Sequence, residues 1–146
     1  LIRDNLFYDN DVQMIADGTG NRVYRNTFLA AKKNQYVIRY LSESGFGLMK
    51  ENRLVSAQND RPFQKGRDTE LTYEEWQDNC DWADTGPGAR AEPPPGEPEL
   101  FLNDGWTPRA VDLPGEYRDA DGRLVKIPLI LEPCSGRLLF KVEAKG

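Results

Sequence analysis

The hydrophobic positions of residues 1–63 fall in short runs that Gly, Asn and Asp residues separate. Runs of three to five residues rich in β-branched and aromatic side chains, bounded in this way, are typical of β-strands. The pattern therefore predicts strands rather than helices over this part of the chain. The clearest runs are 1–3, 12–15, 36–40 and 46–49.

A repeat accompanies these runs. Residues 2–7 align with residues 23–28 in their apolar, Asn and Phe positions, and a weaker third copy beginning at Asn52 aligns with Asn21 at an offset of 31. Short strands repeated every 20–30 residues or so predict the stacked coils of a solenoid. Ordinary hairpins with Asn in their turns are the alternative.

The solenoid interpretation gives the repeated residues distinct roles. Asn tolerates left-handed backbone at a sharp corner, and stacked Asn side chains can hydrogen-bond from coil to coil. Phe7 and Phe28 are expected to fill equivalent interior positions.

Residues 64–99 change character, with ten acidic and three basic residues. Residues 71–77 are predicted to form a short helix in which Thr72 caps the first turn and Glu75 completes a capping box. The Pro/Gly-rich segment 86–96 predicts an extended connector. Three aspartates lie beside Trp residues, and they form either a solvated acidic loop or a cation or sugar site: Asp78, Asp81 and Asp84.

Residues 100–146 alternate in a way that predicts a small antiparallel sheet, which would cover the exposed end of a solenoid. Residues 119–122 (Asp-Ala-Asp-Gly) favour a tight turn over a calcium loop, because they lack the further acidic ligands of such a loop. The predicted strands are 100–102, 109–113, 124–127, 129–131 and 137–142.

Composition narrows the function classes. The 146 residues carry a formal charge of −5, which argues against nucleic-acid binding through a basic surface. No apolar run is long enough to span a bilayer, and no leader peptide is recognisable. The chain has no His, so Ser-His and Cys-His nucleophile pairs are excluded within it. A chain that opens at Leu1 inside an apparent strand is expected to be a fragment or a processed form.

The order of the motifs along the chain is similar to that of a known family. Asn-rich coils are followed by the Thr72–Trp76 helix and by the segments Phe-Leu-Asn (101–103), Val-Asp-Leu-Pro-Gly-Glu-Tyr (111–117) and Leu-Glu-Pro-Cys-Ser-Gly-Arg-Leu-Leu (131–139). This order resembles the C-terminal part of secreted bacterial right-handed parallel β-helix proteins of the pectate-lyase-like group. The resemblance implies carbohydrate processing outside the cell or in the periplasm, and catalytic residues upstream of Leu1.

The resemblance also directs attention to cations and aromatic rings in the coils. An anionic polysaccharide needs both along a groove, and an Arg fork matches a uronate carboxylate. The candidate substrate-binding residues are Lys33, Arg39, Tyr36 and Tyr40. A solvated outer face is the alternative. No residue can be assigned as catalytic.

Cofactors and cross-links are less defined. No cofactor or metal site is evident from the residues, and calcium is implied by the resemblance alone. In a secreted chain, Cys80 and Cys134 would form one disulfide or remain as two free thiols.

The sequence thus predicts a mainly β fold: the final coils of a right-handed parallel β-helix (1–63), an acidic helix and loop connector (64–99) and a C-terminal antiparallel β module (100–146). The expected function is that of the C-terminal portion of a polysaccharide lyase or glycoside hydrolase. The alternative is a non-catalytic carbohydrate-binding or scaffold protein. The expected partners are a polysaccharide and the N-terminal remainder of the same protein, with no nucleic acid and no membrane.

Overall fold

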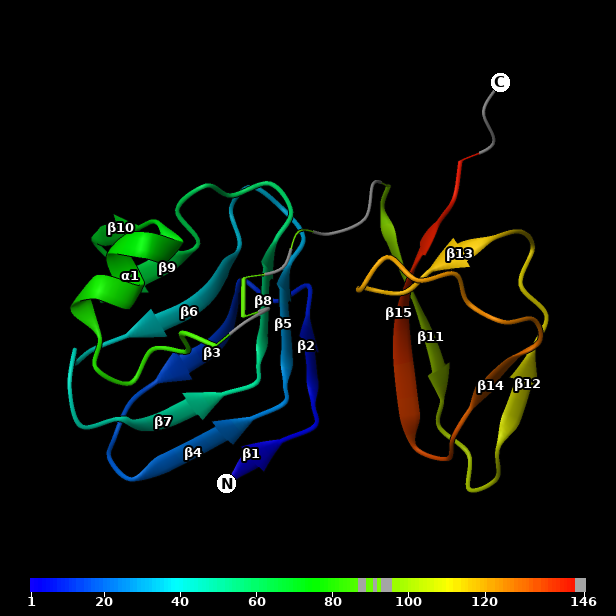
Figure 1. The fold of residues 1–146 in the computed structure, drawn as a ribbon, viewed down its shortest axis with the longest axis horizontal. Helices are drawn as coiled ribbons and strands as arrows, with labels where there is room; N and C mark the ends of the chain where they lie inside the picture. Colours follow the sequence, from blue (N-terminus) through cyan, green and yellow to red (C-terminus); the bar gives the residue numbers. More distant parts are fainter. Residues whose placement is uncertain (87–88, 91, 93–95, 144–146) are drawn as a thin grey trace. The chain divides into compact units, whose positions relative to one another are not determined.

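The computed structural model of the protein describes residues 1–86, 89–90, 92 and 96–143, and the fold is mainly β (Figure 1). The chain divides into two compact units, unit 1 (Leu1–Glu92) and unit 2 (Pro93–Gly146). In the Pro/Gly segment, residues 87–88, 91 and 93–95 lie outside the described residues. No helix in the described ranges is long and apolar enough to cross a membrane.

Unit 1 contains three parallel sheets, which the chain visits in turn during three successive circuits (Figure 1). The first sheet contains β1 (Ile2–Arg3), β4 (Asn21–Tyr24) and β7 (Gly47–Lys50). The second contains β2 (Leu6–Tyr8), β5 (Thr27–Ala30) and β8 (Arg53–Ser56). The third contains β3 (Val12–Ala16), β6 (Tyr36–Tyr40) and β9 (Phe63–Lys65), to which β10 (Thr69–Leu71) adds antiparallel.

The pairing confirms the first repeat. Ile2 pairs with Val23 and Phe7 with Phe28, and the two Phe rings stack with centroids 4.9 Å apart. The predicted third copy is wrong, because Asn52 is stacked on Asn26, 26 residues earlier, instead of on Asn21. The predicted offset of 31 aligned residues of the same type that occupy different positions in the circuit.

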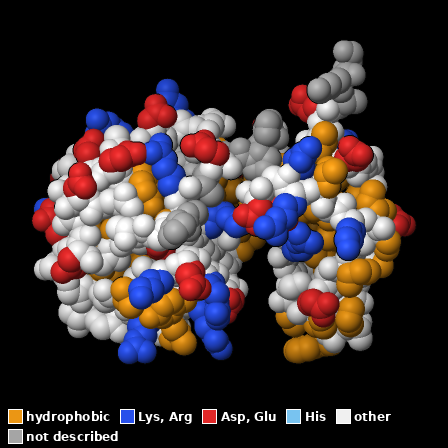
Figure 2. Space-filling view, in the orientation of Figure 1, with side chains coloured by type: hydrophobic (Ala, Val, Ile, Leu, Met, Phe, Trp, Pro, Cys, Tyr) orange, Lys and Arg blue, Asp and Glu red, His pale blue; other side chains and the backbone are white. Residues whose placement is uncertain are grey.

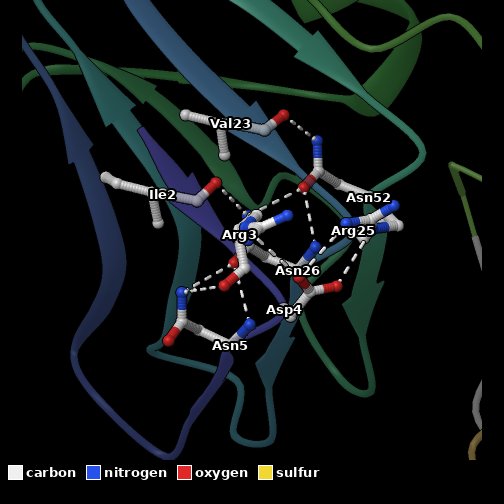
Figure 3. Close-up of polar contacts among 8 residues, drawn as sticks. All are labelled: Ile2, Arg3, Asp4, Asn5, Val23, Arg25, Asn26 and Asn52. Atoms are coloured by element: carbon white, nitrogen blue, oxygen red, sulfur yellow. Dashed lines mark hydrogen bonds and ion pairs between the residues drawn. The ribbon is translucent and has the colours of Figure 1, made fainter.

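Asparagines stacked from circuit to circuit form a hydrogen-bonded ladder, as predicted (Figure 3). The backbone N–H and Nδ2 of Asn5 donate to Oδ1 of Asn26, at 3.0 and 3.1 Å. Asn26 makes the same two bonds to Oδ1 of Asn52, at 2.9 and 3.1 Å. Nδ2 of Asn26 and of Asn52 also reaches back to the carbonyls of Ile2 and Val23. Each buried amide therefore satisfies backbone groups at one corner of the circuits.

The left-handed backbone at this corner belongs to other residues than predicted. Asp4, Arg25 and Glu51 each stand directly before a ladder asparagine and have φ of 57°, 51° and 57°. The ladder asparagines themselves are not in that conformation. Arg25 bonds both carboxylate oxygens of Asp4 at 3.0 and 3.3 Å (Figure 3). The charges at the corner thus alternate in sign along the stack.

The end of the third circuit is closed by α1 (Tyr73–Asn79). Thr72 is the N-cap, and its side chain accepts from the backbone N–H of Glu75, which confirms the predicted cap. The helix buries Trp76, which stacks on Phe63 with ring centroids 4.3 Å apart. Trp82 packs edge-on against Trp76 in the same core cluster.

The acidic segment is therefore largely part of unit 1. The predicted boundary after residue 63 falls inside β9, and the compact unit continues to Glu92. The burial of Trp76 and Trp82 explains why the segment belongs to unit 1. Moving an indole from water into the core stabilises the segment that carries it. Within unit 1, α1 covers this end of the core through Trp76.

Unit 2 is a small antiparallel module, as predicted. One sheet has the order β11-β15-β13, and β12 pairs with β14. Its core comprises Leu113, Tyr117, Leu129, Leu131 and Leu139. The strands are β11 (Pro98–Asn103), β12 (Arg109–Val111), β13 (Tyr117–Arg118), β14 (Leu129–Leu131) and β15 (Ser135–Lys141).

One predicted strand of unit 2 is wrong. Residues 124–127 form only an isolated bridge between Leu124 and Arg118, and Leu124 and Ile127 are 58% and 59% exposed. Their apolar character marks an exposed stretch rather than an inner strand. The turn at 119–122 is confirmed, with Gly122 at φ 82° and its N–H bonded to the Asp119 carbonyl at 2.9 Å.

Candidate functional site

The outer face of the third sheet carries the polar side chains that the sequence selected. Successive residues of a strand point to opposite faces, so Arg39 and Tyr40 on β6 diverge. Arg39 is partly exposed on the outer face, whereas Tyr40 is fully buried, with its ring edge-on to Trp82 at 5.8 Å. Tyr40 therefore belongs to the core and cannot contact a substrate.

Arg39 begins a row of polar side chains that crosses three adjacent strands. Arg39 on β6 is paired with Gln64 on β9, and Gln64 with Glu70 on β10. Tyr36 joins the row, because its hydroxyl donates a hydrogen bond to Glu70 Oε1. We call Tyr36, Arg39, Gln64 and Glu70 the polar row. On the far side of β6, Ile15 of β3 pairs with Arg39 and is 60% exposed.

The guanidinium of Arg39 is held through one edge only. Its Nε donates to Oε1 of Gln64 at 2.9 Å, and Gln64 is itself only 5% exposed. Among the described residues, the two terminal nitrogens of Arg39 have no hydrogen-bond or ion-pair partner. A guanidinium fixed at Nε and open at its terminal nitrogens is prepared to bind a carboxylate.

The other polar groups of this face are already engaged. The hydrogen bond to Glu70, with a contribution from burial, raises the pKa of Tyr36 above its ordinary value. Arg61 donates to the Glu70 carbonyl at 3.3 Å and to Glu75 Oε1 at 3.2 Å. A tyrosine with a raised pKa is a poor proton acceptor at neutral pH, so the polar row is suited to binding rather than to proton abstraction.

The structure brings together two of the four predicted residues, Tyr36 and Arg39. Lys33 is exposed in the turn before β6, and in the part of the chain that the structure describes no hydrogen bond or ion pair links it to them. The sequence missed Gln64 and Glu70. The alternating run from Phe63 to Leu71, with Gly66 at its turn, was the signal for a hairpin that would have paired them.

The three aspartates beside the tryptophans do not form a site. Asp84 is 1% exposed, and its carboxylate accepts hydrogen bonds from Asn52 and from the backbone N–H of Gly86. Asp78 and Asp81 are exposed. Within the described ranges, no group of three or more His, Cys, Asp or Glu side chains is placed to hold a metal ion.

A pocket of about 410 Å³ opens in unit 1 between the start of α1 and the residues that follow β8. Its acidic residues are Asp60, Glu74 and Glu92. Arg90 forms an ion pair with Glu74 and lies over the Tyr73 ring, 5.6 Å from its centroid. Burial raises the pKa of Tyr73 to about 12. The phenol thus stays protonated, and the Arg90–Glu74 pair neutralises part of the pocket.

The two cysteines are free thiols in the structure, one in each unit. Cys80 is buried in the core of unit 1 and Cys134 is exposed in unit 2. Burial raises the pKa of the Cys80 thiol to about 11.

Comparisons with protein-family models, with curated proteins and with solved structures find no match to this chain.

Proposed function

We propose that unit 1 is the end of a right-handed parallel β-helix and that the chain is the C-terminal portion of a carbohydrate-active enzyme. Support comes from the three parallel sheets, each visited once per circuit, and from the asparagine ladder at their corner. Stacked coils of this kind offer a long outer face on which successive sugar rings can be bound.

The observation that carries the proposal is the open guanidinium of Arg39. Gln64 fixes its orientation, and its terminal nitrogens have no partner among the described residues. The proposed ligand is therefore a uronate-containing extracellular polysaccharide, bound through its carboxylates. Ile15, which pairs with Arg39, supplies an apolar contact for the sugar on the same face. Tyr36, which reaches the row through its hydrogen bond to Glu70, supplies a ring at the edge of the row.

The role of this chain in such an enzyme is to bind substrate. Tyr36 and Glu70, the two members of the polar row that could accept a proton, are hydrogen-bonded to each other. Catalytic groups of a lyase or a hydrolase would lie elsewhere in the protein. The same observation favours the second candidate, a non-catalytic carbohydrate-binding β-helix.

Binding of polygalacturonate and alginate, with dextran as the uncharged reference, tests the proposal by affinity electrophoresis and calorimetry. Arg39→Ala should weaken uronate binding by about 10-fold or more, since a charge-assisted hydrogen bond contributes roughly 1.5–3 kcal/mol. Arg39→Lys should restore little, because an ammonium lacks the fork. Arg22→Ala removes an exposed arginine of the first sheet and serves as the matched control.

A second matched pair separates the two tyrosines. Tyr36→Ala should reduce uronate affinity because it removes the ring, whereas Tyr40→Phe should leave the affinity unchanged because Tyr40 is buried. Equal binding by Arg39→Ala and Arg22→Ala, or absence of uronate binding in the unmodified protein, contradicts the proposal. Assays for unsaturated uronate and for reducing ends, run on the same samples, distinguish a lyase, a hydrolase and a binding protein.

A further inference from the structure

Unit 2 exposes one indole almost completely. Trp106, in the loop between β11 and β12, is 88% exposed, whereas Trp76 and Trp82 in unit 1 are 0% and 1% exposed. Tryptophan is on average a strongly buried residue, so an indole held in water calls for a ligand. Figure 2 shows hydrophobic side chains at the end of unit 2 where Figure 1 places this loop.

The loop that carries Trp106 is braced on both sides. Asn103, only 4% exposed, accepts the N–H of Gly105 on its Oδ1 at 3.0 Å. Its Nδ2 donates to the carbonyls of Thr107, Leu131 and Glu132 at 2.8, 3.0 and 3.1 Å.

A second attachment comes from the turn before β15. The backbone N–H of Cys134 donates to the Gly105 carbonyl at 3.2 Å. The residues on either side of Trp106 are therefore fixed to other elements. The backbone that carries the ring therefore loses little conformational freedom when a ligand binds.

Exposed polar residues stand close to Trp106 in the chain. Asp104, Thr107 and Arg109 are exposed, and one terminal nitrogen of Arg109 bonds the Leu102 carbonyl at 3.4 Å. Within residues 104–109, the formal charges of Asp104 and Arg109 cancel. A flat apolar ring bordered by hydrogen-bonding groups matches a pyranose, which has one apolar C–H face and a rim of hydroxyls.

We propose that Trp106 and its braced loop form a binding site in unit 2 for an uncharged sugar ring of a saccharide chain. The class of ligand rests on the proposed function, but the site shares no residue with the polar row. Uronate recognition by Arg39 and ring stacking by Trp106 are therefore separable by mutation.

Trp106 is also a selective reporter of its own site, because the other two tryptophans are buried. The full protein is titrated with neutral cello-, xylo- and malto-oligosaccharides, while acrylamide quenching of tryptophan fluorescence and calorimetry are recorded. At least one neutral series should protect Trp106 from acrylamide. Trp106→Ala should weaken its binding by about 10-fold or more, and Trp106→Phe should retain part of the affinity. Leu124→Ala, which removes another exposed apolar side chain of unit 2, should bind like the unmodified protein.

The outcomes separate this site from the polar row. Neutral-sugar binding that survives Arg39→Ala but not Trp106→Ala supports the proposal, even if uronate binding is absent. Equal affinities of Trp106→Ala and Leu124→Ala overturn it, as does the failure of every neutral series to protect the indole. Protection by lipid vesicles or by a second copy of the chain, with none by sugars, also overturns it.

Discussion

Asp84 ends the asparagine ladder by accepting two hydrogen bonds from Asn52, from the backbone N–H at 2.9 Å and from Nδ2 at 3.1 Å. The ladder has a direction, because each amide donates to the oxygen of the next circuit. A carboxylate accepts and does not donate, so Asp84 is a chemically suitable last member. Its second oxygen accepts the N–H of Gly86 at 3.1 Å.

Replacing Asp84 should therefore destabilise unit 1. In Asp84→Ala, the three groups that now donate hydrogen bonds to Asp84 lose their acceptor. Each one that stays buried lowers the free energy of unfolding by about 1–3 kcal/mol, so we expect a total loss of about 3 kcal/mol or more. Asp84→Asn should lose less, because its amide oxygen can still accept from Asn52 while its NH₂ faces Gly86. Urea unfolding measures the effect.

Asp81→Ala is the matched control, because Asp81 lies three residues earlier and is exposed. Its effect should stay within about 0.5 kcal/mol. If Asp84→Ala unfolds at the same urea concentration as Asp81→Ala, Asp84 does not support the ladder.

Two glycines should respond very differently to alanine. Gly47 has φ 141°, and a Cβ there would lie 1.9 Å from the Asn21 carbonyl oxygen, on the strand paired with it. Gly20 has φ 68° with no atom within 4 Å of a built Cβ. Gly47→Ala should cost about 3 kcal/mol or more, and Gly20→Ala only the left-handed strain of about 1–2 kcal/mol. Comparable melting temperatures of the two variants would show that the Gly47–Asn21 contact relaxes freely.

The sequence predicted much of the fold because the circuits repeat locally. An Asn three residues after an apolar residue and two before a Phe is enough to predict that Phe7 and Phe28 stack. The third circuit keeps the spacing, with Met49 paired to Val23 and Leu54 to Phe28. The match was missed because Leu stands in place of Phe and the offset grows from 21 to 26 residues. The end of unit 1 at Glu92 was missed because the segment was classified by its acidic residues. The burial of Trp76 and Trp82, which joins the segment to unit 1, was not considered.

The candidate site was predicted only in part. Arg39 and Tyr36 were chosen by residue type, and strand alternation would already have separated Tyr40 from Arg39. Gln64 and Glu70 required the β9–β10 hairpin, which sets their register against Arg39. Trp106 was visible in the sequence as a residue, but its exposure depends on the hydrogen bonds of Asn103, which join segments 28 residues apart.

Asn103→Asp should loosen the loop that presents Trp106. The substitution keeps the shape of the side chain but turns a donor toward three carbonyl oxygens into an acceptor. We expect unit 2 to lose about 3 kcal/mol, because a charged oxygen would then face carbonyls without a proton between them. Amide exchange at Gly105, whose N–H bonds Asn103, should accelerate. Glu116→Gln also swaps a carboxylate and an amide, but at an exposed position. It should leave the hydrogen-exchange rate of Gly105 unchanged.

The thiols should differ in reactivity. Cys134 is exposed and Cys80 is buried with a raised pKa, and the thiolate is the reactive form. Ellman's reagent should therefore titrate one thiol in the native protein near pH 8 and two after denaturation. Cys134→Ser should abolish the native reaction. No reactive thiol in the denatured, non-reduced protein would instead indicate a disulfide.

Alkaline pH should destabilise unit 1 through Cys80 and Tyr73. Burial raises the pKa of Cys80 from 9.0 to about 11 and that of Tyr73 from 10.0 to about 12. Between these values the folded state keeps protons that the unfolded chain releases, so the stabilisation is complete below about pH 9 and is lost as the pH rises through 11 and 12. Urea midpoints between pH 7 and pH 12 measure the loss. Cys80→Ala should flatten the decline between pH 9 and pH 11, and Cys134→Ala should not. An unchanged profile in Cys80→Ala would show that the buried thiol does not titrate differently in the folded state.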